Sequence, residues 1–223
     1  MLVAIFRKEF FKIRWAWLLV LLANIGLMAY VAVSTRRLFM LDHPEVVWYR
    51  VLHLGQIHFD TMMYLPLLSG ILIACFQFLP EMWGERFRLS LHLPVTPGRI
   101  AMAHLIVGLV AYTLTALMDL FILMLITATY FPIQGVATSL VTALPWTMAG
   151  AAAYLGGALT LLEPNYRLKA VNLGLGAGVA GLYMVNGMPG AYGPSLLFLV
   201  LPLALLMSSI LLPVLRFRYR RVG

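Results

Sequence analysis

The chain has 223 residues, of which 62% are apolar and only 11% are charged, and its formal net charge is +8. Average soluble domains contain about 25% charged residues, so this chain has too little polar surface to cover a water-soluble protein of its size. These values exclude a soluble globular enzyme, a disordered chain and a disulfide scaffold. They indicate an all-α polytopic membrane protein.

The first 14 residues predict an amphipathic helix in the membrane interface, ahead of the first span. Apolar residues, Phe6 and Phe10 among them, recur at steps of three and four residues, and basic residues such as Lys12 and Arg14 fill much of the other face. That spacing is typical of a helix with one apolar side. The plain alternative is a helix that only anchors the chain to the membrane surface.

Six apolar runs are long enough to cross a bilayer, which takes about 20 residues. They fall at about 15–33, 57–79, 100–129, 138–162, 171–188 and 195–215. Residues 15–223 are therefore expected to form a single six-helix transmembrane domain. The connection 34–56 is the longest on its side and has room for a short interfacial helix.

The basic residues predict the orientation of the chain. All but three of the 16 Lys and Arg residues fall on one side of this topology, and the exceptions are Arg36, Arg37 and Arg50. The positive-inside rule then places both termini in the cytoplasm. Basic residues that flank spans also explain the net charge without a nucleic-acid partner.

The connection between the second and third spans predicts a short cytoplasmic helix at about 81–93. Its acidic residues come first and its basic residues last, which suits the helix dipole, and its aromatic residues recur every four positions. Pro94 and Pro97 end this helix. An aromatic ridge flanked by both charge signs favours a docking surface for another protein over a helix resting on lipid. The predicted docking residues are Glu81, Trp83, Glu85, Phe87, Arg88, Leu91 and Pro94.

A few polar residues fall within the predicted spans. Asp119 is the main intramembrane acid, and with Asn24 it is a candidate for an intramembrane pathway, although hydrogen bonding between helices is the favoured reading of both. Gly174 and Gly178 have the G-x-x-x-G spacing that permits close helix contact, either within the bundle or between two chains. No pattern of residues predicts a catalytic, metal or cofactor site, and a weak grouping of His and Asp residues around His58 matches no metal motif.

The sequence resembles the ABC-2 type permease family, the membrane subunits of type V ABC exporters. The resemblance rests on IFRKEFFKIR entering the first span, on the six spans, and on ERFRLSLHLPVTPGRI between spans two and three. The chain departs from the family pattern at Glu85 and Arg86, where the family often has Gly-Thr, and at His104, where it often has Lys. Its first outer loop is also unusually long for so small a member.

The resemblance implies a mechanism and a set of partners. The helix at 81–93 would be a coupling helix seated on a separate ATPase subunit, and two permease chains, the same or related, would face each other in a bacterial or archaeal cytoplasmic membrane. The chain contains no G-x-x-x-x-G-K-[ST] motif. ATP and Mg would therefore bind to the partner, and the chain would not be an enzyme by itself.

Two alternatives stay open from the sequence. The complex could use ATP to act on a periplasmic or membrane partner without transporting a substrate. The chain could instead be a polytopic enzyme that uses Asp119, although it has no paired intramembrane aspartates and no H-E-x-x-H motif.

Overall fold

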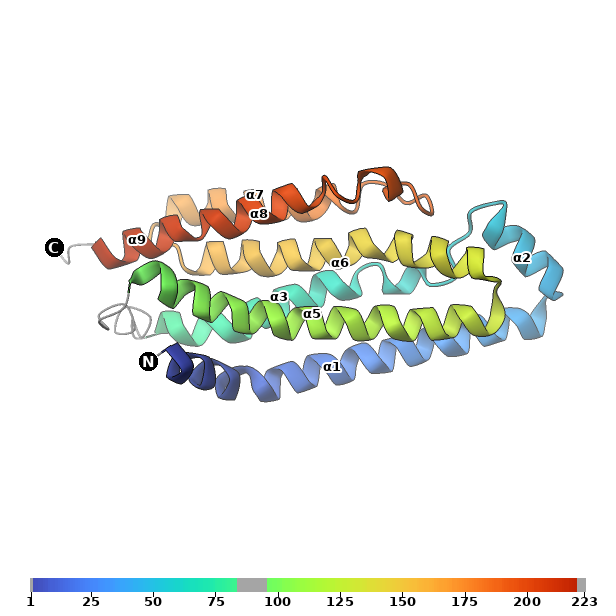
Figure 1. Ribbon diagram of the computed structural model, residues 1–223, viewed down its shortest axis with the longest axis horizontal. Coiled ribbons are helices and arrows are strands. Elements are labelled where there is room, and N and C mark those ends of the chain that lie inside the picture. The colour runs from blue at the N-terminus through green and yellow to red at the C-terminus, as the bar shows by residue number, and fades with distance from the viewer. Residues whose placement is uncertain (1, 84–95, 220–223) are drawn as a thin grey trace.

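The computed structural model describes residues 2–83 and 96–219 of the chain. Its regular elements, over these residues, are all helical. The long helices are α1 (Leu2–Leu41), α3 (Leu65–Met82), α5 (Pro97–Tyr130) and α6 (Ile133–Leu161), as Figure 1 shows. The shorter elements are α2 (Pro44–Leu52), η1 (Asp60–Met62), α7 (Tyr166–Leu182), η3 (Gly193–Ser195), α8 (Val200–Ser209) and α9 (Leu211–Tyr219).

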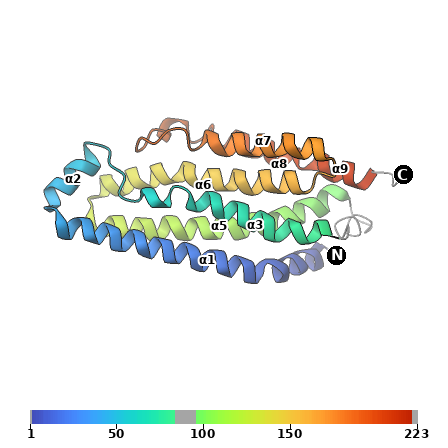
Figure 2. The same ribbon diagram turned by 180° about the vertical axis from the view of Figure 1, so that it is seen from behind.

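The four long helices form an elongated bundle, and α7 with α8 and α9 covers one side of it (Figures 1 and 2). Each of the four, counting η1 together with α3, is long and apolar enough to cross a membrane. The start of α1, the end of α3, the start of α5 and the C-terminal helix α9 lie at the same end of the bundle. We call this the loop end, and we call the end that carries α2 the opposite end.

Helix α1 is continuous through the boundary expected near residue 14 between an interfacial helix and the first span. Figure 1 shows that it bends in its N-terminal part, at the loop end. The uncharged stretch from Trp15 to Thr35 is about 30 Å long at about 1.5 Å per residue. The hydrocarbon core of a bilayer is also about 30 Å thick, so Arg14 and Arg36 mark the two faces of such a core on α1.

The last third of the chain differs most from the expected spans. Helix α7 ends at Leu182 rather than Met188, and Gly-Pro-rich turns follow it as far as Leu199. The expected sixth span is divided at Ile210 into α8 and α9. The expected second span, 57–79, also differs from its helix at the start. The single turn of η1 comes first, and α3 begins at Leu65, beside Pro66. Prolines fit the first turn of a helix because no hydrogen bond is lost there.

Small residues set the closest helix crossings. The α3–α6 crossing joins Gly70 and Gly150, and a Cβ atom added to either would clash with backbone of the other helix. The α6–α7 crossing joins Gly156 and Gly176, whose added Cβ atoms would come within 2.6 and 2.7 Å of the facing Cα atom. The contact within the bundle therefore uses Gly176, whereas Gly174 and Gly178 have nothing within 4 Å of an added Cβ.

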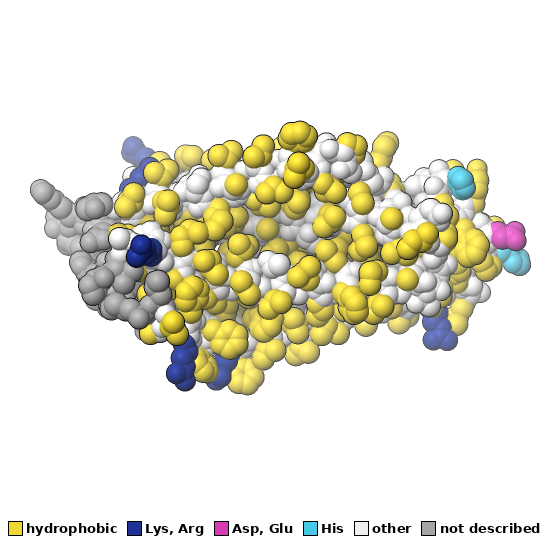
Figure 3. Space-filling view, in the orientation of Figure 1, with side chains coloured by type: hydrophobic (Ala, Val, Ile, Leu, Met, Phe, Trp, Pro, Cys, Tyr) yellow, Lys and Arg dark blue, Asp and Glu magenta, His cyan; other side chains and the backbone are white. Residues whose placement is uncertain are grey.

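The visible face of the molecule in Figure 3 has a broad apolar middle, with the charged side chains near its two ends. In Figure 3, hydrophobic side chains cover the middle of the visible face, and Lys and Arg side chains gather mainly at the loop end. At this end an ion pair of 2.8 Å between Arg216 Nη1 and Glu163 Oε2 joins α9 to the end of α6, and Glu163 is buried. This distribution is that expected of a bundle surrounded by lipid between two interfaces.

Candidate functional site

A buried cluster of charged residues at the loop end joins α1, α3 and α5. Glu9 and His104 are 0% and 1% exposed, and His104 Nδ1 lies 3.1 Å from Glu9 Oε1. Lys12 Nζ lies 2.8 Å from Glu9 Oε2 and 3.0 Å from Glu81 Oε1. Lys8 contacts the same Glu81 oxygen at 3.1 Å. Two carboxylates therefore share Lys12, and each has a second basic partner.

Neutral polar side chains extend this cluster to α6. Gln77 Nε2 donates to Glu9 Oε2 at 3.2 Å and to the His104 carbonyl at 2.7 Å. The Tyr154 hydroxyl donates to Gln77 Oε1 at 2.9 Å. Helix α5 passes over these groups at Gly108, where an added Cβ would clash with both Gln77 Oε1 and the Tyr154 hydroxyl. The cluster is thus packed as well as hydrogen-bonded.

The cluster lies where α3 and α5 lead into and out of the connection between them. Glu81 lies in the last turn of α3 and His104 in the second turn of α5, so the two helices that flank the 83–96 connection are both tied to α1. Removing one partner from a buried ion pair costs about 3–5 kcal/mol, because the other charge stays buried without compensation. The helices on both sides of the connection are therefore held to α1, α3 at Glu81 and α5 at His104.

The predicted docking residues fall in different places. Glu81 is 2% exposed and belongs to the buried cluster, so it supports the connection from inside. Trp83 directly follows α3 and is 78% exposed. Of the expected helix at 81–93, only the first three residues are described. Glu85, Phe87, Arg88, Leu91 and Pro94 lie outside the described residues.

The residues predicted for the interfacial helix all lie on the N-terminal part of α1. Lys12 points into the buried cluster, and Phe6 packs at the edge of the core. Phe10 is 51% exposed, and the Arg14 guanidinium lies 4.8 Å from the centre of the Phe11 ring. This segment therefore has one side inside the bundle and one side facing the surroundings.

The two intramembrane candidates have different surroundings. Asn24 Nδ2 donates to Ser69 Oγ at 2.9 Å and to the Val20 carbonyl at 2.7 Å, which joins α1 to α3. Asp119 is 1% exposed, and neither carboxylate oxygen has a hydrogen-bond partner within the described part of the chain. Asn24 thus forms the hydrogen bond between helices that its sequence position favours, whereas Asp119 forms none with the described residues.

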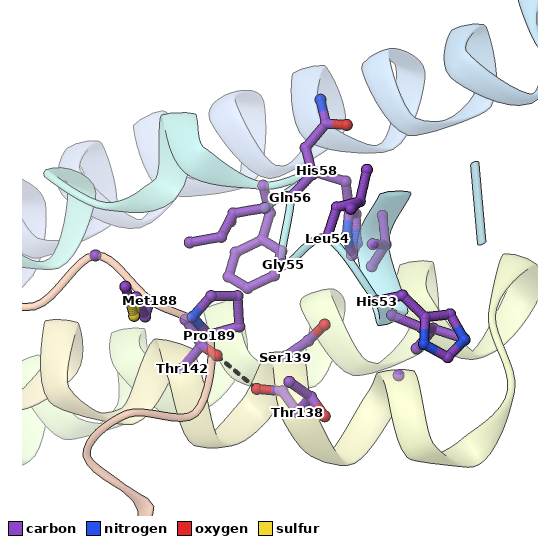
Figure 4. Close-up of a pocket in the computed structure, with 16 residues that line it drawn as sticks. His53, Leu54, Gly55, Gln56, His58, Thr138, Ser139, Thr142, Met188 and Pro189 are labelled. Carbon is purple, nitrogen blue, oxygen red and sulfur yellow. Dashed lines mark hydrogen bonds between the residues drawn. The ribbon is translucent and has the colours of Figure 1, made fainter. Parts of the chain in front are cut away.

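A cavity of about 430 Å³ opens at the opposite end, between the segment after α2, the start of α6 and the turn at Pro189 (Figure 4). His58 lines this cavity and stacks on Phe131 with ring centres 4.7 Å apart. Burial lowers the pKa of His58 to about 4, so the ring is neutral near pH 7. No group of three metal-ligating side chains occurs in the part of the chain that the structure describes.

The sequence singled out Glu81 and Lys12 but did not connect them, and it passed over Glu9, Gln77 and Tyr154 as members of a site. Features of the sequence could have indicated these members. Glu9 lies three residues before Lys12 on the same helix, and Gln77 and His104 are isolated polar residues inside apolar helices. Isolated polar residues in such helices point inward and find partners.

Comparisons of the chain with protein-family models, with curated proteins and with solved structures give no match. The function proposed below therefore depends on the residues of this chain and on their geometry.

Proposed function

We propose that this chain is the membrane subunit of an ABC exporter of the ABC-2 type and that it works with a separate ATPase subunit. The observation that supports the proposal is the buried charged cluster, which ties the two helices that flank the 83–96 connection to α1, α3 at Glu81 and α5 at His104. A connection that only had to join two spans would need a few residues and no buried charges.

The cluster suits a mechanical role. ATP can drive a change in the membrane only if it binds one conformation of the complex better than another. In this proposal the ATPase contacts the connection at Trp83 and beyond, and its closure displaces the ends of α3 and α5. Glu81 passes the displacement to Lys8 and Lys12 on α1, and His104 passes it to Glu9.

The proposed topology has six spans: α1, α3, α5, α6, α7, and α8 with α9. The loop end then faces the cytoplasm, in agreement with its basic residues. A second permease chain, the same or related, completes the complex. ATP and Mg bind to the ATPase, and the chain itself binds no nucleic acid and catalyses no reaction.

The test is co-expression of the full chain with the ATPase encoded by a neighbouring reading frame. We expect a stable complex, and we expect Trp83→Asp to lower the amount of co-purified ATPase by at least about tenfold, because a buried aromatic anchor contributes 2 kcal/mol or more to an interface. Phe87→Asp should have a similar effect. Tyr49→Asp is the matched control, since Tyr49 is an exposed aromatic residue on α2 at the opposite end.

A second variant separates docking from transmission. Glu81→Gln removes the charge that faces Lys8 and Lys12 but changes no exposed side chain. We expect it to keep the ATPase bound while changing the ATPase rate of the complex. Assembly and rate that are unchanged in Trp83→Asp, Phe87→Asp and Glu81→Gln alike would contradict the proposed function.

A further inference from the structure

The N-terminal part of α1 carries two arginines that no carboxylate neutralises within the residues that the structure describes. The guanidinium groups of Arg7 and Arg14 lie 5.6 and 4.8 Å from the centre of the same Phe11 ring, which holds both cations on one side of the helix. Arg14 Nε is buried and has no hydrogen-bond partner in the described structure. Two cations held near one ring attract an anion.

An apolar groove of about 250 Å³ runs beside these arginines, between α1 and α5. Arg14 follows Phe10 by four residues, so the two side chains are neighbours on the helix surface. The groove is therefore bordered by a cationic group on one side. The side chains that line it are Phe6, Phe10, Ile13, Trp17, Val110 and Leu114, among others.

The depth of the groove matches a membrane interface. Arg14 lies at the end of the uncharged stretch of α1 that is as long as a hydrocarbon core is thick. Arg7 lies about 10 Å further along the helix, in the headgroup region. Trp15, 65% exposed, lies beside them, as aromatic residues do at membrane interfaces.

We propose that an anionic phospholipid binds at this place, with its phosphate between Arg7 and Arg14 and one acyl chain in the groove between α1 and α5. Charge complementarity selects the anionic headgroup, because neither guanidinium group has a carboxylate partner among the described residues. The apolar lining accepts the chain, and the groove leads from Phe6 in the headgroup region towards Leu114 in the hydrocarbon core. Basic pockets between membrane helices bind anionic lipid headgroups in this way. The site is independent of the proposed function.

The test uses the purified full chain in detergent, with dioleoylphosphatidylglycerol or dioleoylphosphatidylcholine added. We expect the anionic lipid to raise the thermal unfolding midpoint and to stay bound in native mass spectrometry, and the zwitterionic lipid to do so much less. Arg7→Gln with Arg14→Gln should weaken the binding of the anionic lipid about thirtyfold, since each basic residue near the surface contributes about 1 kcal/mol.

Two further variants make the result specific. Arg36→Gln with Arg37→Gln removes two exposed cations at the opposite end of α1 and should leave the affinity unchanged. Val110→Trp fills the groove from a half-exposed position and leaves both arginines in place, and it should weaken lipid binding as well.

Four outcomes would overturn the proposal. They are an unchanged affinity in the Arg7 and Arg14 double variant, an equal loss in the Arg36 and Arg37 control, an unchanged affinity in Val110→Trp, and an equal stabilisation by inorganic phosphate or glycerol 3-phosphate. The last result would indicate a site for a free anion. If the Arg7 and Arg14 double variant kept its lipid affinity but lost the co-purified ATPase, the two arginines would belong to a protein contact instead.

Discussion

The effects of single buried polar residues on stability can be compared at Asp119 and Asn24. Both are buried, but Asn24 bonds to Ser69 across two helices, whereas the Asp119 oxygens have no partner within the described part of the chain. An unpaired buried polar group costs about 1–3 kcal/mol. We expect Asp119→Leu to raise the free energy of unfolding by about that amount and Asn24→Leu to lower it by a similar amount.

The measurement is the thermal unfolding midpoint of the purified chain in detergent, recorded for both variants and for the unchanged protein. A fall in stability for Asp119→Leu would mean that this carboxyl group has partners that the described chain does not supply. A gain in stability together with a loss of activity in the complex would instead mark Asp119 as a residue kept for function at a cost in stability.

Individual contacts at the loop end show where reasoning from sequence stops. The docking role expected of Glu81 came from its place near the start of a charged connection, and the structure buries it against Lys8 and Lys12. Helical spacing alone could not reveal this, because the partners lie on a helix about 70 positions away in the chain. By contrast, Asn24 was expected to bond between helices, and it does.

At the scale of helices, the α3–α6 crossing depends on glycine. A Cβ atom at Gly150 would clash with the Pro66 carbonyl group and the Tyr112 hydroxyl, which itself donates to the Thr147 carbonyl at 2.5 Å. Backbone atoms cannot move aside as a flexible side chain can. We expect Gly150→Ala to force the two helices apart and to lower stability by about 1–3 kcal/mol, the usual cost of overpacking.

Gly178→Ala is the matched control for this variant, because nothing lies within 4 Å of an added Cβ at Gly178. The two variants can be compared by their thermal unfolding midpoints in detergent. Equal destabilisation would show that the cost comes from helix conformation in general rather than from the crossing. If Gly178→Ala changed only the oligomeric state, the open face of α7 would be the place where two chains meet.

Apolar runs predict helices well where no turn-forming residue interrupts them. The expected spans 100–129 and 138–162 correspond closely to α5 and α6. The expected spans 171–188 and 195–215 differ from the helices found there. A run of apolar residues indicates that a segment lies in an apolar environment, but it does not determine where the backbone is helical. Helix α7 ends at Leu182, and the turn-forming residues Asn186, Gly187 and Pro189 follow within the fifth run.

The G-x-x-x-G pair of α7 illustrates the same limit. Its spacing predicts a close helix contact at Gly174 and Gly178, either within the bundle or between two chains, but within the bundle the neighbouring Gly176 makes the contact with α6. Glycines occur on more than one side of α7, so their spacing does not indicate which side faces the bundle. That choice depends on the position of Gly156, which the sequence of α7 does not contain.

For the whole molecule, the distribution of charge predicts how the bundle lies in the membrane. Basic side chains gather at the loop end, and an apolar belt separates them from the opposite end (Figure 3). Lys and Arg residues near the ends of spans favour the cytoplasmic side, so this distribution predicts that the loop end faces the cytoplasm. The chain has a single cysteine, Cys75, so replacing it with alanine provides a background without thiols.

We expect a cysteine at position 41 to react with a membrane-impermeant maleimide in intact cells, and a cysteine at position 3 to react only after the membrane is opened. Leu41 and Val3 lie near the two ends of α1 and are 72% and 78% exposed, so burial does not explain a difference in labelling. A cysteine appended after Gly223 should behave as the one at position 3, because the six spans that we propose would return the chain to its starting side. Labelling of position 3 in intact cells would contradict the orientation. Labelling of the appended cysteine but not of position 3 in intact cells would contradict the even number of spans.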